Sequence, residues 1–186
     1  MNPLAQQLVE AGLLQFGSFY VNGVESPVQT HLEMLPSYPD VLRALVQAMA
    51  PLVPRVDHLL ATAEAVPLGV ALSLQASVPL VYSRGTGEAA VFDLVGAYDI
   101  GHPTALVTNV LLDDDSTLKL AKKAESVGLE IGRVLCVLNL RAQPFSVTAL
   151  LSLDDLLDDF VREGVLPERE SRAVRAWLRR GCRICE

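Results

Sequence analysis

The chain has 186 residues, of which 51% are hydrophobic and 20% charged, so it suits one folded domain and is not expected to be disordered. Fifteen basic and 22 acidic residues give a formal net charge of -7, which argues against nucleic acid as the main partner. No apolar run is long enough to cross a membrane, and the opening MNPLAQQLVE lacks a signal-peptide pattern. Three cysteines do not make a disulfide framework. Together these features predict a cytoplasmic protein with no membrane partner.

The first third of the chain predicts two helices separated by a hairpin. The expected elements are a helix over Pro3–Gln15, strands over Phe16–Val21 and Val28–Leu32, and a helix over Tyr38–Leu52. Asn22 and Gly23 form a dipeptide that favours a tight hairpin turn. Ser37 is a candidate N-cap for the second helix, and Pro39 suits its first turn.

The middle of the chain alternates short apolar runs with helical patterns, which is typical of βαβ units and a parallel sheet buried on both faces. Strands are expected at Val56–Ala61, Pro79–Tyr82, Ala105–Leu111 and Ile131–Leu140, and helices at Val66–Ser77 and Thr117–Val127. Residues 84–103 contain several glycines and predict a loop or short hairpin leaving a sheet edge. The predicted fold class is therefore α/β, a mainly parallel twisted sheet flanked by helices.

A strand and two helices are expected at the end of the chain. The strand is Phe145–Leu151, and Ser152 is the candidate N-cap of the next helix. The inner face of that helix carries Leu153, Leu156, Leu157 and Phe160, and Pro167 ends it. The last helix, Glu168–Arg180, is expected to dock through Ala173, Val174 and Trp177, with Trp177 at least half buried. The predicted units are an N-terminal helix and hood (1–36), a core (37–165) and a C-terminal helix and tail (166–186).

Several segments follow one another in a distinctive order between Leu13 and Phe160. They are FGSFYVNGVESP, LPSYPDVLRALVQAM, VPLGVALSLQASVPLVYSRG, ALVTNVLLDDDSTLKLAKKAESVGLEIGRVLCVLNL and VTALLSLDDLL. Their order and spacing resemble the type I phosphoribosyltransferases, specifically the orotate phosphoribosyltransferase branch. The resemblance implies a small N-terminal hood, a homodimer, and transfer of a phosphoribosyl group from phosphoribosyl diphosphate (PRPP) to orotate.

The PRPP-binding signature of that family is degenerate in this chain. In the family, an apolar strand ends in two acids that hold the ribose hydroxyls, and a Thr- and Gly-rich loop then binds the 5′-phosphate through its amides. The acidic pair falls here on Thr108 and Asn109. The loop positions carry Leu112, Asp113, Asp114, Asp115 and Ser116, of which only the serine fits the pattern. One acid about 4 Å from a phosphate costs roughly 4 kcal/mol at an effective dielectric of 20, so the resemblance predicts that PRPP binding is lost.

Other family positions are altered as well. The diphosphate-loop positions carry Ala63, Glu64 and Ala65, where small glycines are expected. Arg84 is retained at the start of the catalytic loop, but the following GTGEAAVFDL contains neither Lys nor His. The hood pocket keeps Ser26 and Pro27. The sequence therefore assigns no catalytic residue and no metal ligand set.

The charged runs of the chain also have plain structural interpretations. The run Asp113–Ser116 is expected to cap a helix N-terminus, with a cation or basic ligand as the alternative. Asp154, Asp155, Asp158 and Asp159 predict a solvated helix face. Arg172, Arg175 and Arg179 share a helical face and predict either a solvated surface or ion pairs with that Asp-rich helix.

The histidines and terminal cysteines also favour structural roles. His58 has no nucleophile or metal partner at a recognisable spacing and is expected to be a hydrogen-bonded structural residue. Cys182 and Cys185 form a Cys-x-x-Cys pair at the end of the sequence, but they lack the strand before them that a redox motif needs. Zinc would need two further ligands, so we expect no metal there.

These observations leave three functional hypotheses. The main one is a phosphoribosyltransferase-like protein that has lost PRPP binding and catalysis and acts as a ligand-binding, regulatory or scaffolding homodimer, with a possible small-molecule ligand and no cofactor. The second is a divergent orotate phosphoribosyltransferase of pyrimidine biosynthesis, which would need Mg²⁺. The third is a changed enzyme whose acidic pocket takes a metal or a cationic substrate.

Overall fold

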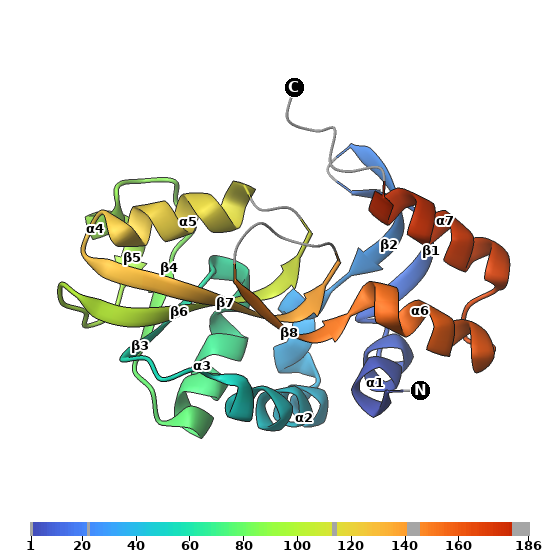
Figure 1. Ribbon diagram of the computed structural model, residues 1–186, viewed down its shortest axis with the longest axis horizontal. Helices are drawn as coiled ribbons and strands as arrows, with labels where there is room; N and C mark the ends of the chain where they lie inside the picture. Colours follow the sequence, from blue (N-terminus) through green and yellow to red (C-terminus); the bar gives the residue numbers. More distant parts are fainter. Residues whose placement is uncertain (1, 22, 113–114, 141–145, 180–186) are drawn as a thin grey trace.

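The structure is a computed structural model in which residues 2–21, 23–112, 115–140 and 146–179 are described. Its centre is a six-stranded sheet with the strand order β5-β4-β3-β6-β7-β8 (Figure 1). The strands are β3 (His58–Ala61), β4 (Leu80–Ser83), β5 (Leu94–Val95), β6 (His102–Leu111), β7 (Leu129–Asn139) and β8 (Val147–Ser152). Neighbouring strands are parallel except β4 and β5, which confirms the predicted α/β fold with a mainly parallel sheet.

Helices cover both faces of this sheet. The helices α2 (Pro39–Met49) and α3 (Val66–Ala76) lie on one face, and α4 (Ala90–Asp93) and α5 (Asp115–Glu125) on the other (Figure 1). Because successive side chains of a strand point to opposite faces, Leu59 and Leu60 of β3 belong to two different apolar clusters. Burial on both faces explains why the central strands read as continuous apolar runs. None of the described helices combines the length and the apolar character that crossing a membrane requires.

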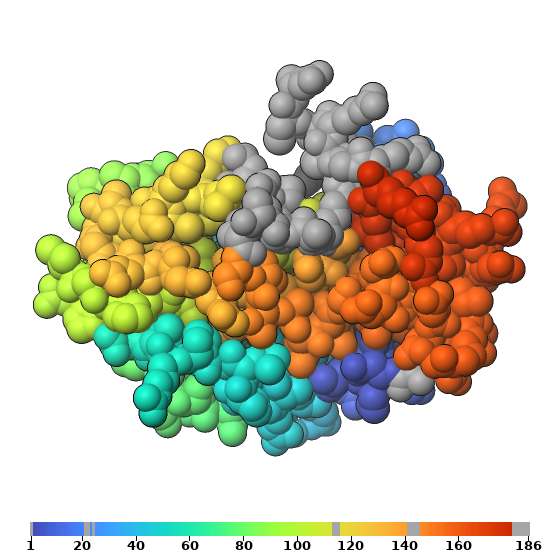
Figure 2. Space-filling model, in the orientation of Figure 1, coloured from blue at the N-terminus to red at the C-terminus, as the bar shows by residue number. Residues whose placement is uncertain are grey.

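The two ends of the chain pack together at one end of the molecule. The elements there are α1 (Pro3–Glu10), the antiparallel hairpin of β1 (Leu14–Val21) and β2 (Val24–Thr30), α6 (Leu153–Arg162) and α7 (Glu168–Arg179). In Figures 1 and 2 the orange and red C-terminal helices lie beside the blue N-terminal segments. Phe16 of β1 meets Phe160 of α6 edge-on, with ring centroids 5.4 Å apart. The hood and the C-terminal helices therefore share one apolar core.

Charge pairing also joins α6 to α7. Arg175 donates hydrogen bonds to Asp154 at 2.8 Å and to Asp158 at 2.6 Å. This confirms the ion-pairing alternative for Arg175, whereas Arg172 and Arg179 are exposed. Trp177 is more than half buried against the main apolar cluster, as expected.

The inner face of α7 confirms the predicted Val174 and Trp177 but not Ala173. Ala173 is exposed, and Ser171 and Val174 are the buried residues of the helix. Positions three apart share a helix face, so Ser171 lines up with Val174 while Ala173 turns away. Cys182 and Cys185 lie outside the described residues.

The first helix is shorter than its apolar spacing indicates. It ends at Glu10, and Gly12 adopts a left-handed φ of 68°, which glycine tolerates and which stops the helix. Leu14 and Gln15, predicted as helical, instead begin β1. The second hairpin strand begins at Val24 rather than Val28, so the hood residues Ser26 and Pro27 lie inside β2.

The predicted helix caps are wrong in one case and incomplete in the other. Ser37 ends a 3-10 turn, η1 (Leu32–Ser37), and Tyr38 occupies the N-cap position of α2 without a capping side-chain hydrogen bond. Ser152 occupies the N-cap position of α6, but its side chain makes no capping hydrogen bond.

Leu52, the expected end of the second helix, lies in the separate 3-10 turn η2 (Ala50–Leu52). The helix that Pro167 was expected to end stops earlier, at Arg162, and Gly164 after it adopts a left-handed φ of 71°. The remaining boundaries agree within three residues where they can be compared.

Candidate ligand site at the carboxyl edge of the sheet

The carboxyl ends of β3, β4 and β6 meet at one edge of the sheet, where open parallel sheets bind ligands. β3 leads through Thr62 into a single 3-10 turn, η3 (Ala63–Ala65), at the start of α3. β4 leads into Arg84, and β6 carries Thr108 and Asn109 near its end. The backbone N–H of Thr62 donates to the carbonyl of Val107 at 3.0 Å and so fixes the turn against β6. The structure thus brings most of the predicted site positions to one edge.

The two positions that replace the family's acids are buried and engaged within the chain. Thr108 is 2% exposed and Asn109 is 4% exposed. The hydroxyl of Thr62 donates to that of Thr108 at 3.4 Å, and the amide nitrogen of Asn109 donates to the carbonyl of Glu64 at 2.9 Å. The Asn109 side-chain oxygen has no hydrogen-bond partner among the described residues. These two neutral side chains therefore fasten η3 to β6.

The turn η3 presents its remaining side chains unevenly. Ala63 and Glu64 are exposed, whereas Ala65 is fully buried under the turn. The Glu64 carboxylate therefore adds negative charge to this edge of the sheet. On the neighbouring strand, the Arg84 side chain is exposed, and its backbone N–H donates to the carbonyl of Asp93 at 2.9 Å.

The PRPP-loop positions are only partly within the described chain. Leu112 is half-buried, Asp115 is the first residue of α5, and Ser116 is exposed. Asp113 and Asp114 lie outside the described residues. The capping role of this acidic run remains a prediction.

The two hood positions lie in β2. Ser26 is buried, and its hydroxyl donates to the carbonyl of Val28 at 2.6 Å. Pro27 is half-buried beside it. The Ser26 hydroxyl thus makes its donor hydrogen bond within its own strand. A role for Ser26 in a ligand pocket remains a prediction.

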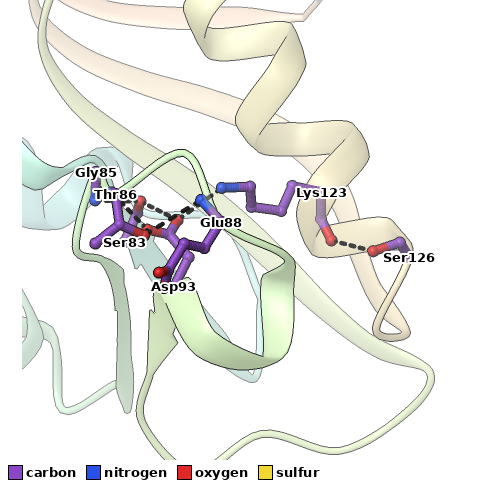
Figure 3. A network of polar contacts seen from close by, with 7 residues as sticks. All are labelled: Ser83, Gly85, Thr86, Glu88, Asp93, Lys123 and Ser126. Atoms are coloured by element: carbon purple, nitrogen blue, oxygen red, sulfur yellow. Dashed lines mark hydrogen bonds and ion pairs between the residues drawn. The ribbon is translucent and has the colours of Figure 1, made fainter.

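Sequence reasoning missed a buried carboxylate beside this edge. Asp93 is fully buried and accepts hydrogen bonds from the Ser83 hydroxyl at 2.6 Å, from both the amide and the hydroxyl of Thr86 at 2.9 Å, and from the Lys123 ammonium at 3.0 Å (Figure 3). Burial alone would raise the pKa of Asp93, but the bonds from Ser83, Lys123 and Thr86 outweigh burial and hold that pKa well below its usual range. Ser83 and Thr86 lie near Asp93 in the sequence and were a weak signal for a buried carboxylate. Its cationic partner, Lys123, lies 30 positions away and could not be identified from the sequence.

A second polar group lies at the opposite, amino edge of the sheet. Asp57 and His102 pair at 2.8 Å, and the His102 ring meets that of His58 at a centroid distance of 5.4 Å. His58 is buried, and its Nδ1 has no partner among the described residues, so the expectation of a fully hydrogen-bonded His58 is wrong at this atom.

A surface hollow of about 670 Å³ lies at this same amino edge. Its lining comes from Pro54–Val56, Ile100–Gly101, Pro103–Thr104, Glu125 and Gly128–Arg133. None of these residues is a predicted site position. Within the described part of the chain, no three His, Cys, Asp or Glu residues are grouped so as to hold a metal ion.

Comparisons with curated proteins find orotate phosphoribosyltransferases along most of the chain. The one from Archaeoglobus fulgidus is 27% identical over 161 residues, which cover 83% of this chain and 90% of that protein. The one from Methanopyrus kandleri is 31% identical over 170 residues, which cover 82% and 90%. The chain belongs to the orotate phosphoribosyltransferase family. No family model matches the chain.

Solved structures show the same fold for this family member. A UMP synthase from Leishmania donovani superposes with a TM-score of 0.83 at 24% identity, over 94% of this chain and 41% of that longer one. The orotate phosphoribosyltransferase from Francisella tularensis superposes with a TM-score of 0.73 at 17% identity, over 95% and 94%. These similarities confirm the type I phosphoribosyltransferase fold.

Proposed function

We propose that this family member does not bind PRPP or transfer phosphoribosyl groups, and that it acts as a ligand-binding, regulatory or scaffolding protein. The observation that carries the proposal is that two neutral, buried side chains, Thr108 and Asn109, lie near the end of β6. The family pattern has two carboxylates there to hold the ribose hydroxyls. Both replacements are neutral and buried, and the Asn109 amide is bonded to the Glu64 carbonyl.

Mg²⁺ does not fit the two positions, Thr108 and Asn109, where the family pattern has acids. The ion prefers carboxylate oxygens, water and substrate phosphates in near-octahedral geometry. Thr108 and Asn109 offer only neutral oxygens, and both side chains are almost fully buried. These two side chains therefore would not hold a metal ion.

The cations needed for the leaving diphosphate are also few. Arg84 is the single Arg or Lys between Ser83 and Pro103 in the sequence. The exposed Glu64 carboxylate lies on the turn after the adjacent strand, β3. A site that must stabilise developing negative charge needs donors and cations aimed at it. Among the described residues directly after β3 and β4, Arg84 is the one cation, and Glu64 adds an acid.

The second candidate is a divergent orotate phosphoribosyltransferase that makes orotidine 5′-phosphate and diphosphate from orotate and PRPP. The relatives favour this candidate, since those from Archaeoglobus fulgidus and Methanopyrus kandleri are both named for the transferase. The two candidates therefore rest on different observations, the relatives' names on one side and the side chains of the site on the other.

An assay of orotate-dependent diphosphate release separates the two candidates. We expect this chain, supplied with orotate, PRPP and Mg²⁺, to release no more diphosphate than a reaction without protein. The Archaeoglobus fulgidus relative, assayed in parallel, is the positive control. Release that requires both orotate and this chain would establish the transferase and overturn the loss-of-function proposal.

We also propose that the chain forms a homodimer. The Leu-rich face of α2 is not free for this contact, because Leu45, Val46 and Met49 are buried within the chain's own core. Large apolar side chains that remain exposed nearby are Leu52, Val70 and Leu74, and the hood exposes Tyr20 and Met34.

Light scattering tests the dimer at tens of micromolar protein. We expect a particle of about 40 kDa, twice the chain mass of 20.1 kDa. A stable dimer should bury about 800 Å² per partner. Leu74→Glu on the outer face of α3 should shift the particle toward the monomer, whereas Gln75→Glu, also exposed on α3, should not. A monomer for the unaltered chain would contradict this proposal.

A further inference from the structure

We propose that Asp93 latches the loop of residues 84–89 to helix α5, which makes this loop a fixed wall of the carboxyl edge and not a segment that closes over a ligand. The latch is defined by Ser83, Thr86, Asp93 and Lys123 (Figure 3). It does not depend on whether transferase chemistry survives, because it rests on contacts within the chain.

Every hydrogen bond on the loop side of the latch holds a residue close to Arg84. The Asp93 Oδ1 accepts from the amide and the hydroxyl of Thr86, and its Oδ2 accepts from the Ser83 hydroxyl. The Ser83 hydroxyl accepts in turn from the Gly85 amide at 3.0 Å. Both carboxylate oxygens are thus satisfied, and the loop backbone is tied to a side chain that is fully buried.

The other half of the latch comes from α5. The Lys123 ammonium lies 3.0 Å from Asp93 Oδ2 and is only partly exposed. The Ser126 hydroxyl donates to the Lys123 carbonyl at 2.6 Å and steadies the end of that helix. α5 begins at Asp115, among the PRPP-loop positions. One carboxylate therefore joins the loop after β4 to α5.

The orientation of α4 supports the latch. Ala90 and Asp93 face inward, while Val91 and Phe92 remain 64% and 66% exposed. Exposing two large apolar side chains is unfavourable in water. The helix thus buries the charged Asp93 and leaves the apolar Val91 and Phe92 in water. The hydrogen bonds and the ion pair that Asp93 makes with Ser83, Thr86 and Lys123 must therefore more than offset this cost.

Hydrogen exchange in the full chain tests the latch. The amides of Gly85 and Thr86 should be protected in the unaltered protein because both donate hydrogen bonds. Lys123→Met keeps most of the side-chain volume and removes the charge, and it should speed exchange at both amides by about tenfold or more. The amide of Leu106 in β6, which reports global opening, should change less than these two.

Two further variants sharpen the result. Lys122→Met changes the exposed neighbour of Lys123 by the same chemistry and should leave the loop amides unchanged. Lys123→Arg keeps the cation and should restore most of the protection. Loop amides that exchange at unstructured rates in the unaltered protein, or equal effects of Lys122→Met and Lys123→Met, would overturn the latch. Diphosphate release in the orotate assay would overturn the proposed function and leave the latch standing.

Discussion

Titration calorimetry of this chain with PRPP and Mg²⁺ at millimolar ligand is expected to show no heat of binding. Ribose would meet Thr108 and Asn109 in place of two carboxylates, and both are buried and bonded within the chain. The 5′-phosphate would meet a loop whose sequence holds three consecutive aspartates. Each acid about 4 Å from a phosphate costs roughly 4 kcal/mol at an effective dielectric of 20, which is close to a thousandfold in affinity.

The titration needs two controls because a binding enthalpy can pass through zero. It should be repeated at a second temperature, and the Archaeoglobus fulgidus relative should be titrated under the same conditions. A dissociation constant below about 100 μM, or roughly -5.5 kcal/mol, would restore the transferase hypothesis. Loss of heat in both proteins would point to the ligand preparation, and fresh PRPP would then decide the matter.

Asp93→Asn is expected to lower the free energy of unfolding by about 3 kcal/mol, the usual cost of removing one partner from a buried ion pair. The amide cannot accept at both atoms, so Ser83, Thr86 and Lys123 would compete for one remaining oxygen. Urea unfolding at neutral pH measures the loss. Glu88→Gln makes the same chemical change on an exposed residue of the same loop and should cost less than about 0.5 kcal/mol.

Acid should remove the contribution of Asp93 in a defined direction. Its pKa in the folded chain lies below the ordinary value, so the unfolded chain binds the proton first as the pH falls. The stabilisation is therefore complete above about pH 5 and shrinks as the pH falls through about 4 and below. Between pH 5 and 2.5 the Asp93→Asn variant should lose less stability than the unaltered protein. Parallel pH curves for the two proteins would show that Asp93 is not held ionised by these contacts.

Much of the fold was predictable because it depends on local pattern. The apolar runs around Leu59, Leu106 and Leu135 are long enough and continuous enough to indicate strands buried on both faces. The boundaries were less predictable, since a helix stop at Gly12 and a 3-10 turn ending at Ser37 depend on backbone geometry that competes with side-chain spacing. The positions of the candidate site came from the family resemblance, and the structure places several of them after the carboxyl ends of β3, β4 and β6.

The sequence by itself determined the α/β class, since hydrophobic period is a local property, and the family resemblance added the candidate site positions, including Thr108 and Asn109 where two acids are expected. Only the tertiary structure decided what these side chains bind. Asn109 bonds to Glu64, 45 positions away, and Asp93 is buried with Lys123, 30 positions away. Such partners are set by strand order and helix packing, which bring distant segments together, and a buried charge is stable only where those donors converge.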